Sequence, residues 1–202
     1  MASKIQTVLG VIDSRDMGFT LPHEHLFYDL RGVARPKDFL IDREDVVKTV
    51  LPSLKALKER GVSTLFECST GGIGRDTLIL EALARRSGVN VVAPTGLYKE
   101  AFMPDWVRNR TEDELAGWMT DEIEIGIENT SVKAGFIKLA ATDEGLTILE
   151  KEVLRAATRA ATKTGAAIAQ HISGPQSGLI LLQTIKVLEE EHFNPGKFVW
   201  VH

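Results

Sequence analysis

Short apolar runs alternate with longer segments of helical periodicity along the whole chain of 202 residues. The apolar runs are rich in β-branched and aromatic residues, which strands prefer. We expect strands near residues 18–25, 62–68, 90–96, 134–140, 166–171 and 197–202. Because these runs are almost continuously apolar, the strands should be buried on both faces, as in a parallel sheet.

The segments between the apolar runs carry helix boundaries. Thr111 with Glu114, and Thr147 with Glu150, have the spacing of a capping box, which satisfies free backbone N–H groups at a helix start. Pro52 should kink or restart the helix in which it lies. We expect helices over about 43–60 and 75–87, one that opens at 111, one from 147 to the glycine at 165, and one over 176–191.

Alternating strands and helices indicate an α/β fold built from right-handed βαβ crossovers. The chain has no low-complexity tract, no short-period repeat and no linker rich in Pro, Gly or Ser. A single domain over residues 1–202 is therefore expected. At this point an open doubly wound sheet and a closed barrel fit the pattern equally well.

Composition narrows the class of protein. A hydrophobic content of 44% and a charged content of 26% are ordinary for a soluble globular domain. The formal charge of -4 without a basic cluster argues against a nucleic-acid partner. No apolar run approaches the roughly 18 residues of a membrane span, and the first residues lack the apolar segment of a secretory signal. The single cysteine, Cys68, excludes an intrachain disulfide and favours a cytoplasmic location.

Two histidines alternate at the end of the first apolar run, in Leu21-Pro22-His23-Glu24-His25. Side chains at i and i+2 of a strand share a face, so His23 and His25 should point the same way. Two imidazoles on one face can bind a divalent metal such as Zn²⁺. Two histidines in a polar surface loop would give the same pattern, and the pair alone does not decide between these interpretations.

Lys138 lies within the apolar run 134–140. Burial disfavours the charged ammonium and lowers the pKa of a lysine. A neutral amine can react with carbon dioxide to form a carbamate, which is a carboxylate and can bridge two cations. Taken alone, the residue favours the simpler interpretation, a strand-end lysine whose ammonium reaches solvent.

His171 and His202 each end a predicted strand. Ligands of α/β proteins gather at the carboxyl ends of strands. Either histidine alone fits a structural residue, but four histidines and Lys138 at strand ends together indicate a metal site. His192, at a helix end, is expected to be a surface or capping residue.

Other polar segments favour structural roles. Residues 71–75 follow a strand but lack the spacing of a Rossmann or P-loop phosphate site, which favours a tight turn. Glu67 and Cys68 could line the same strand ends, where Cys68 is expected to pack rather than act as a nucleophile. The acidic residues 121–124 are expected to form a solvated helix face.

The same segments resemble the phosphotriesterase family of the amidohydrolase superfamily, including its lactonase branch. The resemblance lies in residues 18–25, 69–76, 93–98 and 134–138, and it keeps its order over nearly the whole chain. It implies a (β/α)₈ TIM barrel, of which this sequence covers about six of the eight βα units, and a homodimer.

The resemblance also implies a set of ligands. His23 and His25 would bind one metal, His171 and His202 the other, and a carbamylated Lys138 would bridge both. The cofactors would be two divalent metal ions, with zinc first and cobalt, iron, manganese or nickel as alternatives. The family's aspartate ligand at the eighth strand has no counterpart here, so we expect the sequence to be part of a longer chain.

The activity that the resemblance implies is metal-dependent hydrolysis by a hydroxide shared between the two metals. The lactonase branch has a tyrosine at the position of Tyr98, whereas dedicated phosphotriesterases have a tryptophan. Tyr98 is therefore expected to contact a small lactone or organophosphate ester, although it could merely pack its loop. The expected function is a lactonase with promiscuous phosphotriesterase activity. The alternatives are a phosphotriesterase (aryldialkylphosphatase) proper and an inactive metal-binding barrel that acts as a binding protein.

Overall fold

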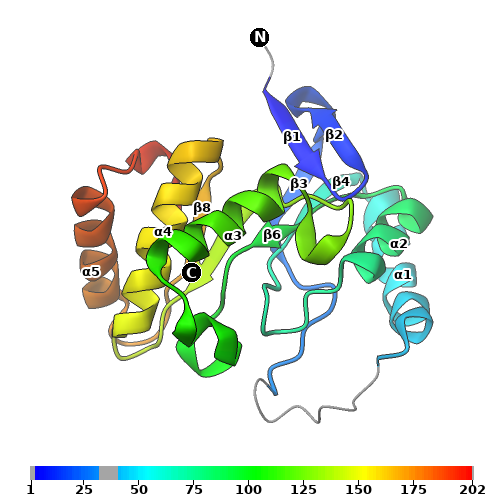
Figure 1. The fold of residues 1–202 in the computed structure, drawn as a ribbon. Helices are drawn as coiled ribbons and strands as arrows, with labels where there is room; N and C mark the ends of the chain where they lie inside the picture. Colours follow the sequence, from blue (N-terminus) through cyan, green and yellow to red (C-terminus); the bar gives the residue numbers. More distant parts are fainter. Residues whose placement is uncertain (1–2, 32–40, 202) are drawn as a thin grey trace.

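The computed structural model describes residues 3–31 and 41–201 (Figure 1). Its parallel strands are β3 (Phe19–Glu24), β4 (Val62–Glu67), β5 (Asn90–Val92), β6 (Pro94–Thr95), β7 (Phe136–Ala140), β8 (Ile168–His171) and β9 (Phe198–Val201). Every neighbouring pair is parallel, in sheets ordered β3-β4-β5 and β6-β7-β8-β9. Only Ala93 separates β5 from β6, so the two sheets follow one another as a single succession of strands.

The order of the strands decides between the two α/β architectures. In a doubly wound sheet the strand order reverses at a switch point. Here the spatial order follows the chain order from β3 to β9 without reversal. The fold is therefore α/β with a succession of parallel βα units, consistent with part of a (β/α)₈ barrel.

The helices begin and end close to the positions expected from the sequence. The α-helices are α1 (Arg43–Glu59), α2 (Thr77–Ser87), α3 (Glu112–Glu124), α4 (Ile148–Thr164) and α5 (Ser177–Glu190). Both capping boxes are present, at Thr111 and Thr147, and α4 ends on a left-handed Gly165. Pro52 does not divide α1. Pro52 and Lys48, whose carbonyl it leaves without an N–H partner, lie on the exposed face, where water can replace that bond.

The sequence did not predict the antiparallel hairpin of β1 (Lys4–Thr7) and β2 (Gly10–Asp13). The Val8 N–H donates to the carbonyl of Val91 over 2.8 Å, and Ile5 packs against buried residues of the sheet. The hairpin therefore covers the amino-terminal ends of the strands, opposite the predicted site. The described residues also form short 3₁₀ turns: η1 (Ser14–Asp16), η3 (Glu100–Phe102), η4 (Asp105–Asn109), η5 (Ile127–Asn129) and η6 (Pro195–Lys197).

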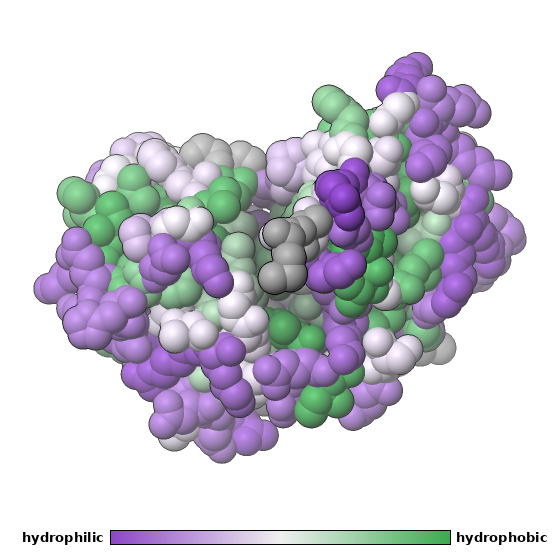
Figure 2. Space-filling model, turned by 90° about the horizontal axis from the view of Figure 1, so that it is seen from above, coloured by the Kyte–Doolittle hydropathy of each residue, from purple (hydrophilic) through white to green (hydrophobic). Residues whose placement is uncertain are grey.

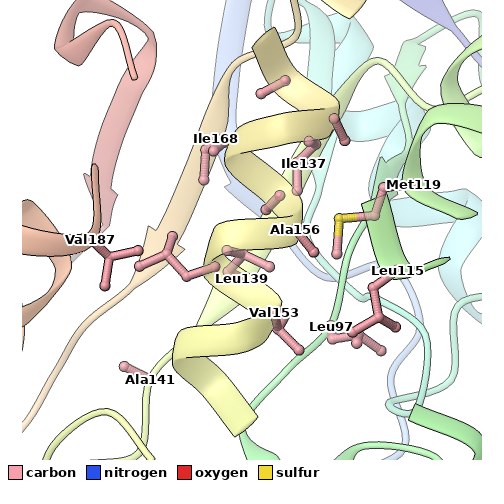
Figure 3. Close-up of a cluster of buried hydrophobic side chains, with 14 of the residues drawn as sticks. Leu97, Leu115, Met119, Ile137, Leu139, Ala141, Val153, Ala156, Ile168 and Val187 are labelled. Carbon is pink, nitrogen blue, oxygen red and sulfur yellow. The ribbon is translucent and has the colours of Figure 1, made fainter. Parts of the chain in front are cut away.

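The α-helices pack against one face of the sheet. In β7, Ile137 and Leu139 join the buried cluster around Val153 and Ala156 of α4 (Figure 3). A second large cluster packs α1 and α2 against β4 and β5. The smallest cluster has no helical member and consists of Cys68, Val92 and Phe136, with Ile5, Phe66 and Ala169 packed against it. Because side chains alternate along a strand, Phe136 and Lys138 lie on this helix-free face.

The acidic segment 121–124 is not uniformly solvated. Glu122 of α3 is 2% exposed, so the expectation of a solvated face is wrong for this residue. Its carboxylate accepts two hydrogen bonds of 2.7 Å from Arg75. The sequence pattern missed this pair because its partners are 47 residues apart.

The molecular surface is hollowed between the half formed by α4 and α5 and the half formed by α1, α2 and the hairpin (Figure 2). Apolar side chains are exposed on α5, where Leu182 is 66% exposed, and on β9, where Val199 is 51% exposed. Within the described ranges, no helix combines the length and hydrophobicity needed to cross a bilayer.

Candidate metal centre

His23 and His25 come together at the end of β3. Their Nε2 atoms lie 3.2 Å apart and their ring centroids 5.2 Å apart. Two zinc–nitrogen bonds of about 2.0–2.1 Å at a tetrahedral angle place their nitrogens about 3.3 Å apart. The spacing of the two imidazoles is therefore compatible with two ligands of one cation.

The ring of His25 is oriented by residues at and just after the end of β4. Its Nδ1 lies 3.0 Å from Oγ of Ser69 and 4.0 Å from Oε1 of Glu67. Hydrogen bonding at Nδ1 leaves Nε2 to a metal, which is how outer partners orient ligating histidines in metalloproteins. The buried Glu67 carboxylate accepts from the N–H groups of Leu26, at 2.6 Å, and Ser69, at 2.7 Å. It thereby joins the ends of β3 and β4.

Burial also changes the acidity of Glu67. Its side chain is 1% exposed, and burial raises its pKa to about 7 against the opposing hydrogen bonds from Ser69 and Leu26. Glu67 therefore belongs to the strand ends that the sequence indicated. Its observed contacts give it the role of holding backbone in place.

Lys138 is buried among the strands, with 1% of its surface exposed. Its Nζ donates to the carbonyl of Leu139 over 3.0 Å. Burial lowers its pKa to about 8, while the nearby Cys68 opposes that shift. The alternative of an ammonium that reaches solvent is therefore excluded.

Cys68 has the packing environment expected of it. It is 1% exposed and belongs to the small cluster on the helix-free face, together with Phe136. Burial raises the pKa of its thiol to about 12, against the influence of the Lys138 amine. A thiolate is therefore strongly disfavoured, which argues against a nucleophilic role.

His171 ends β8 opposite Ala140, the last residue of β7. Its Nε2 lies 2.9 Å from Oγ of Ser173, and its ring centroid lies 5.9 Å from that of Tyr98. Tyr98 is half-buried, and burial raises the pKa of its phenol. Tyr98 therefore stands beside a candidate ligand, where the sequence predicted a substrate contact.

The second histidine of this pair cannot be placed in the same way, because His202 lies outside the described residues. Among the residues that the structure describes, no three His, Cys, Asp or Glu side chains form a group that could hold a metal ion. A lysine carbamate is not among those residue types. The convergence of His23, His25, Lys138, His171 and His202 thus stays a prediction.

Sequence reasoning missed four polar residues near these strand ends. Ser69 and Ser173 each contact a candidate ligand, and Lys99 pairs with Asp143 at 2.7 Å. Asp143 in turn accepts from Ser173 at 3.4 Å, and Lys99 holds the pKa of Asp143 below its usual value. Both serines stand two residues after a strand, a position that could have indicated their role.

Gly96 lies two residues before Tyr98 in the chain, and its backbone packs closely against the backbone of Lys138. It has φ +106°, and a Cβ there would lie 2.1 Å from the carbonyl oxygen of Lys138. We expect Gly96→Ala to destabilise the fold by more than the ~1–3 kcal/mol of backbone strain alone, because it adds a clash with main chain. Gly10→Ala is the matched control, since Gly10 has φ +120° and open space around it. Equal unfolding midpoints of the two variants in urea would contradict the role of the contact.

The sequence profile of the phosphotriesterase family matches residues 3–202. The chain belongs to the phosphotriesterase family. It is 34% identical over 191 residues to an aryldialkylphosphatase of Saccharolobus solfataricus, covering 95% of this chain and 60% of that one. It is 40% identical over 163 residues to the phosphotriesterase homology protein of Escherichia coli, covering 80% of this chain and 55% of that one.

A solved structure supports the same placement. It is of an organophosphate hydrolase engineered from a weak promiscuous lactonase template, and it superposes with a TM-score of 0.85 at 26% identity. The superposition covers 98% of this chain and 62% of that one. The chain thus spans about 55–60% of the curated phosphotriesterase-family relatives named above.

Proposed function

We propose that this protein is a binuclear metal-dependent hydrolase, a lactonase with promiscuous phosphotriesterase activity. The observation that carries the proposal is the environment of Lys138. A lysine with 1% exposure and a pKa near 8 stands on the helix-free face of a parallel sheet, in a family of hydrolases. Burial of this kind favours the neutral amine that carbamylation requires.

The proposed ligands are His23 and His25 for one metal, His171 and His202 for the other, and carbamylated Lys138 between them. The neutral Nζ of Lys138 adds to the carbon of carbon dioxide and releases one proton, which gives the carbamate. When bound, two divalent cations supply a hydroxide nucleophile at neutral pH and polarise the substrate oxygen on which negative charge develops. Zinc suits the imidazoles, and cobalt, iron, manganese and nickel are alternatives.

The chain's own residues position and shield this chemistry. Ser69 at 3.0 Å from His25 Nδ1 fixes the orientation of that ring. Tyr98, 5.9 Å from the ring of His171, offers an aromatic wall and a phenol to a bound ester. The hairpin of β1 and β2 closes the opposite ends of the strands, so substrate enters from the side on which these residues lie.

Tyr98 favours a lactone as the preferred substrate, because the lactonase branch has tyrosine at this position. The likeness to a solved lactonase template supports this choice. A phosphotriesterase proper is the second candidate, supported by the 34% identity to an aryldialkylphosphatase. We further propose a homodimer, from the family resemblance, and a cytoplasmic location, from the single buried Cys68.

Metal removal tests this proposal directly. The protein should contain two divalent ions per chain by elemental analysis and should hydrolyse lactones with a higher kcat/KM than phosphotriesters. Dialysis against a chelator should abolish both the metal content and the turnover, and added zinc should restore them, because the cations supply the nucleophile. Turnover that survives complete metal removal would refute the mechanism. Bound metals without hydrolysis of any lactone, ester or triester would favour the binding-protein alternative.

A further inference from the structure

A buried ion pair lies outside the candidate metal centre, between the loop after β4 and helix α3. The side chains of Arg75 and Glu122 are 1% and 3% exposed. They form two parallel hydrogen bonds, both of 2.7 Å, from the Arg75 guanidinium to the Glu122 carboxylate. A third partner, Glu128, accepts from Arg75 at 2.9 Å but is 56% exposed.

Burying the two charges of this pair costs free energy of desolvation. Two charges removed from water repay their desolvation only with good geometry, and apolar residues of similar volume often stabilise a fold as well or better. Among the described residues, Arg75 Nε finds no hydrogen-bond acceptor, so the guanidinium is not even fully satisfied. Stability alone therefore gives a poor account of the pair, and its contacts suggest what else it does.

Both members of the pair hold the same short strand. Nη1 of Arg75 donates to the carbonyl of Pro94 over 2.9 Å, and the hydroxyl of Thr95 donates to Glu122 over 2.7 Å. Pro94 and Thr95 are the whole of β6. Within the described residues this strand is paired only to β7, and its proline has no N–H to donate. The ion pair thus supplies constraints that the strand's own ladder lacks.

Whatever fixes β6 also fixes Tyr98. Only Gly96 and Leu97 separate Thr95 from Tyr98, and Gly96 already packs against the Lys138 backbone. Leu97 forms a bridge to Gly71, in the loop that also carries Arg75. The pair therefore constrains the backbone before Tyr98 in two ways. It forms hydrogen bonds with β6 directly, and Arg75 lies in the same loop as Gly71, which pairs with Leu97.

We propose that Arg75 and Glu122 are positioning residues that fix Tyr98 at the metal centre, and that they thereby set substrate discrimination. The inference rests on the proposed function for the role of Tyr98. Neither residue is proposed to touch substrate or metal. Loosening the pair should change how the site chooses between lactones and phosphotriesters, while metal content stays the same.

Thr95 allows a gentle test, because Thr95→Val keeps the shape and removes only the hydroxyl that donates to Glu122. Thr95→Ser keeps the hydroxyl and is the conservative control. Glu128→Gln is the second control, since among the described residues the Glu128 carboxylate bonds Arg75 and no hydrogen bond from it to β6 is seen. We expect Thr95→Val to change the ratio of kcat/KM for a lactone over a phosphotriester by about threefold or more, mainly through KM. Neither control should match this change.

A spectroscopic measurement separates this inference from the proposed function. The chain has only two tyrosines, so labelling with 3-fluorotyrosine gives two ¹⁹F resonances, and Tyr28→Phe assigns them. The Tyr98 resonance should move in Thr95→Val and stay in place in Thr95→Ser and Glu128→Gln. An unmoved resonance, equal movement in a control, or a moved resonance with unchanged substrate discrimination would each overturn the inference. Absence of hydrolysis by the unsubstituted protein would instead refute the proposed function.

Discussion

Replacing Lys138 by methionine should reduce kcat/KM by about a thousandfold or more, without destabilising the metal-free fold. The substitution removes the amine that would carry the bridging carbamate, and each metal contributes several kcal/mol of transition-state stabilisation. Lys138 is 1% exposed and lies among apolar strand residues, so an apolar side chain of similar length fits its surroundings. Elemental analysis should show fewer than two metals per chain, while the thermal midpoint of the metal-free variant should equal or exceed that of the metal-free unsubstituted protein, because bound metal itself stabilises the fold.

Lys138→Glu is the matched control, because it supplies a carboxylate without carbamylation, although at shorter reach. It should retain more metal and more activity than Lys138→Met. Growth with ¹³C-labelled bicarbonate should give a carbamate NMR signal in the unsubstituted protein and none in either variant. Full activity of Lys138→Met with two bound metals would show that Lys138 does not bridge them.

Replacing only Arg75 of the Arg75–Glu122 pair should give a larger loss of folding stability than replacing both residues or Glu128. Arg75→Met leaves the Glu122 carboxylate buried without its cation, which costs about 3–5 kcal/mol in comparable pairs. For a chain of this length, a loss of that size lowers the thermal midpoint by roughly 6–20 °C. Differential scanning calorimetry or urea unfolding measures the effect.

The double variant Arg75→Met with Glu122→Met should regain most of that loss, because no buried charge is left uncompensated. Glu128→Gln should change stability by less than about 1 kcal/mol, since its carboxylate is 56% exposed and exposed ion pairs contribute little. A double variant as unstable as the single one would mean that both charges contribute to the fold in their own right.

Lys138 can be singled out from the sequence pattern, whereas Arg75 and Glu122 cannot. Lys138 stands out in the sequence, because a lysine in the middle of the apolar run 134–140 is unusual whatever the fold. Arg75 and Glu122 do not stand out, since each belongs to a segment that is polar and ordinary by itself. Their importance appears only when the loop after β4 and helix α3 are brought together.

The sequence by itself determined the local elements and much of the candidate chemistry. Hydrophobic periodicity located the parallel strands but not the hairpin of β1 and β2, and both capping boxes, at Thr111 and Thr147, begin helices as expected. The closeness of His23 and His25 also followed from local pattern, whereas the burial of Lys138 did not, because its apolar run alone favoured an ammonium that reaches solvent. Such features depend on residues within one turn or one strand of each other. The interacting residues are therefore close in the sequence, where a local pattern can reveal them.

Only the tertiary structure decided the relations between distant segments. The strand order, which distinguishes a succession of βα units from a doubly wound sheet, has no signature in periodicity. The contact of Ser69 with His25 joins residues 44 apart, and the buried pair of Arg75 and Glu122 joins residues 47 apart. Each such contact depends on the register of parallel strands and on helix packing. The register and the helix packing are determined by the free energy of the whole core, and not by the two residues that form the contact.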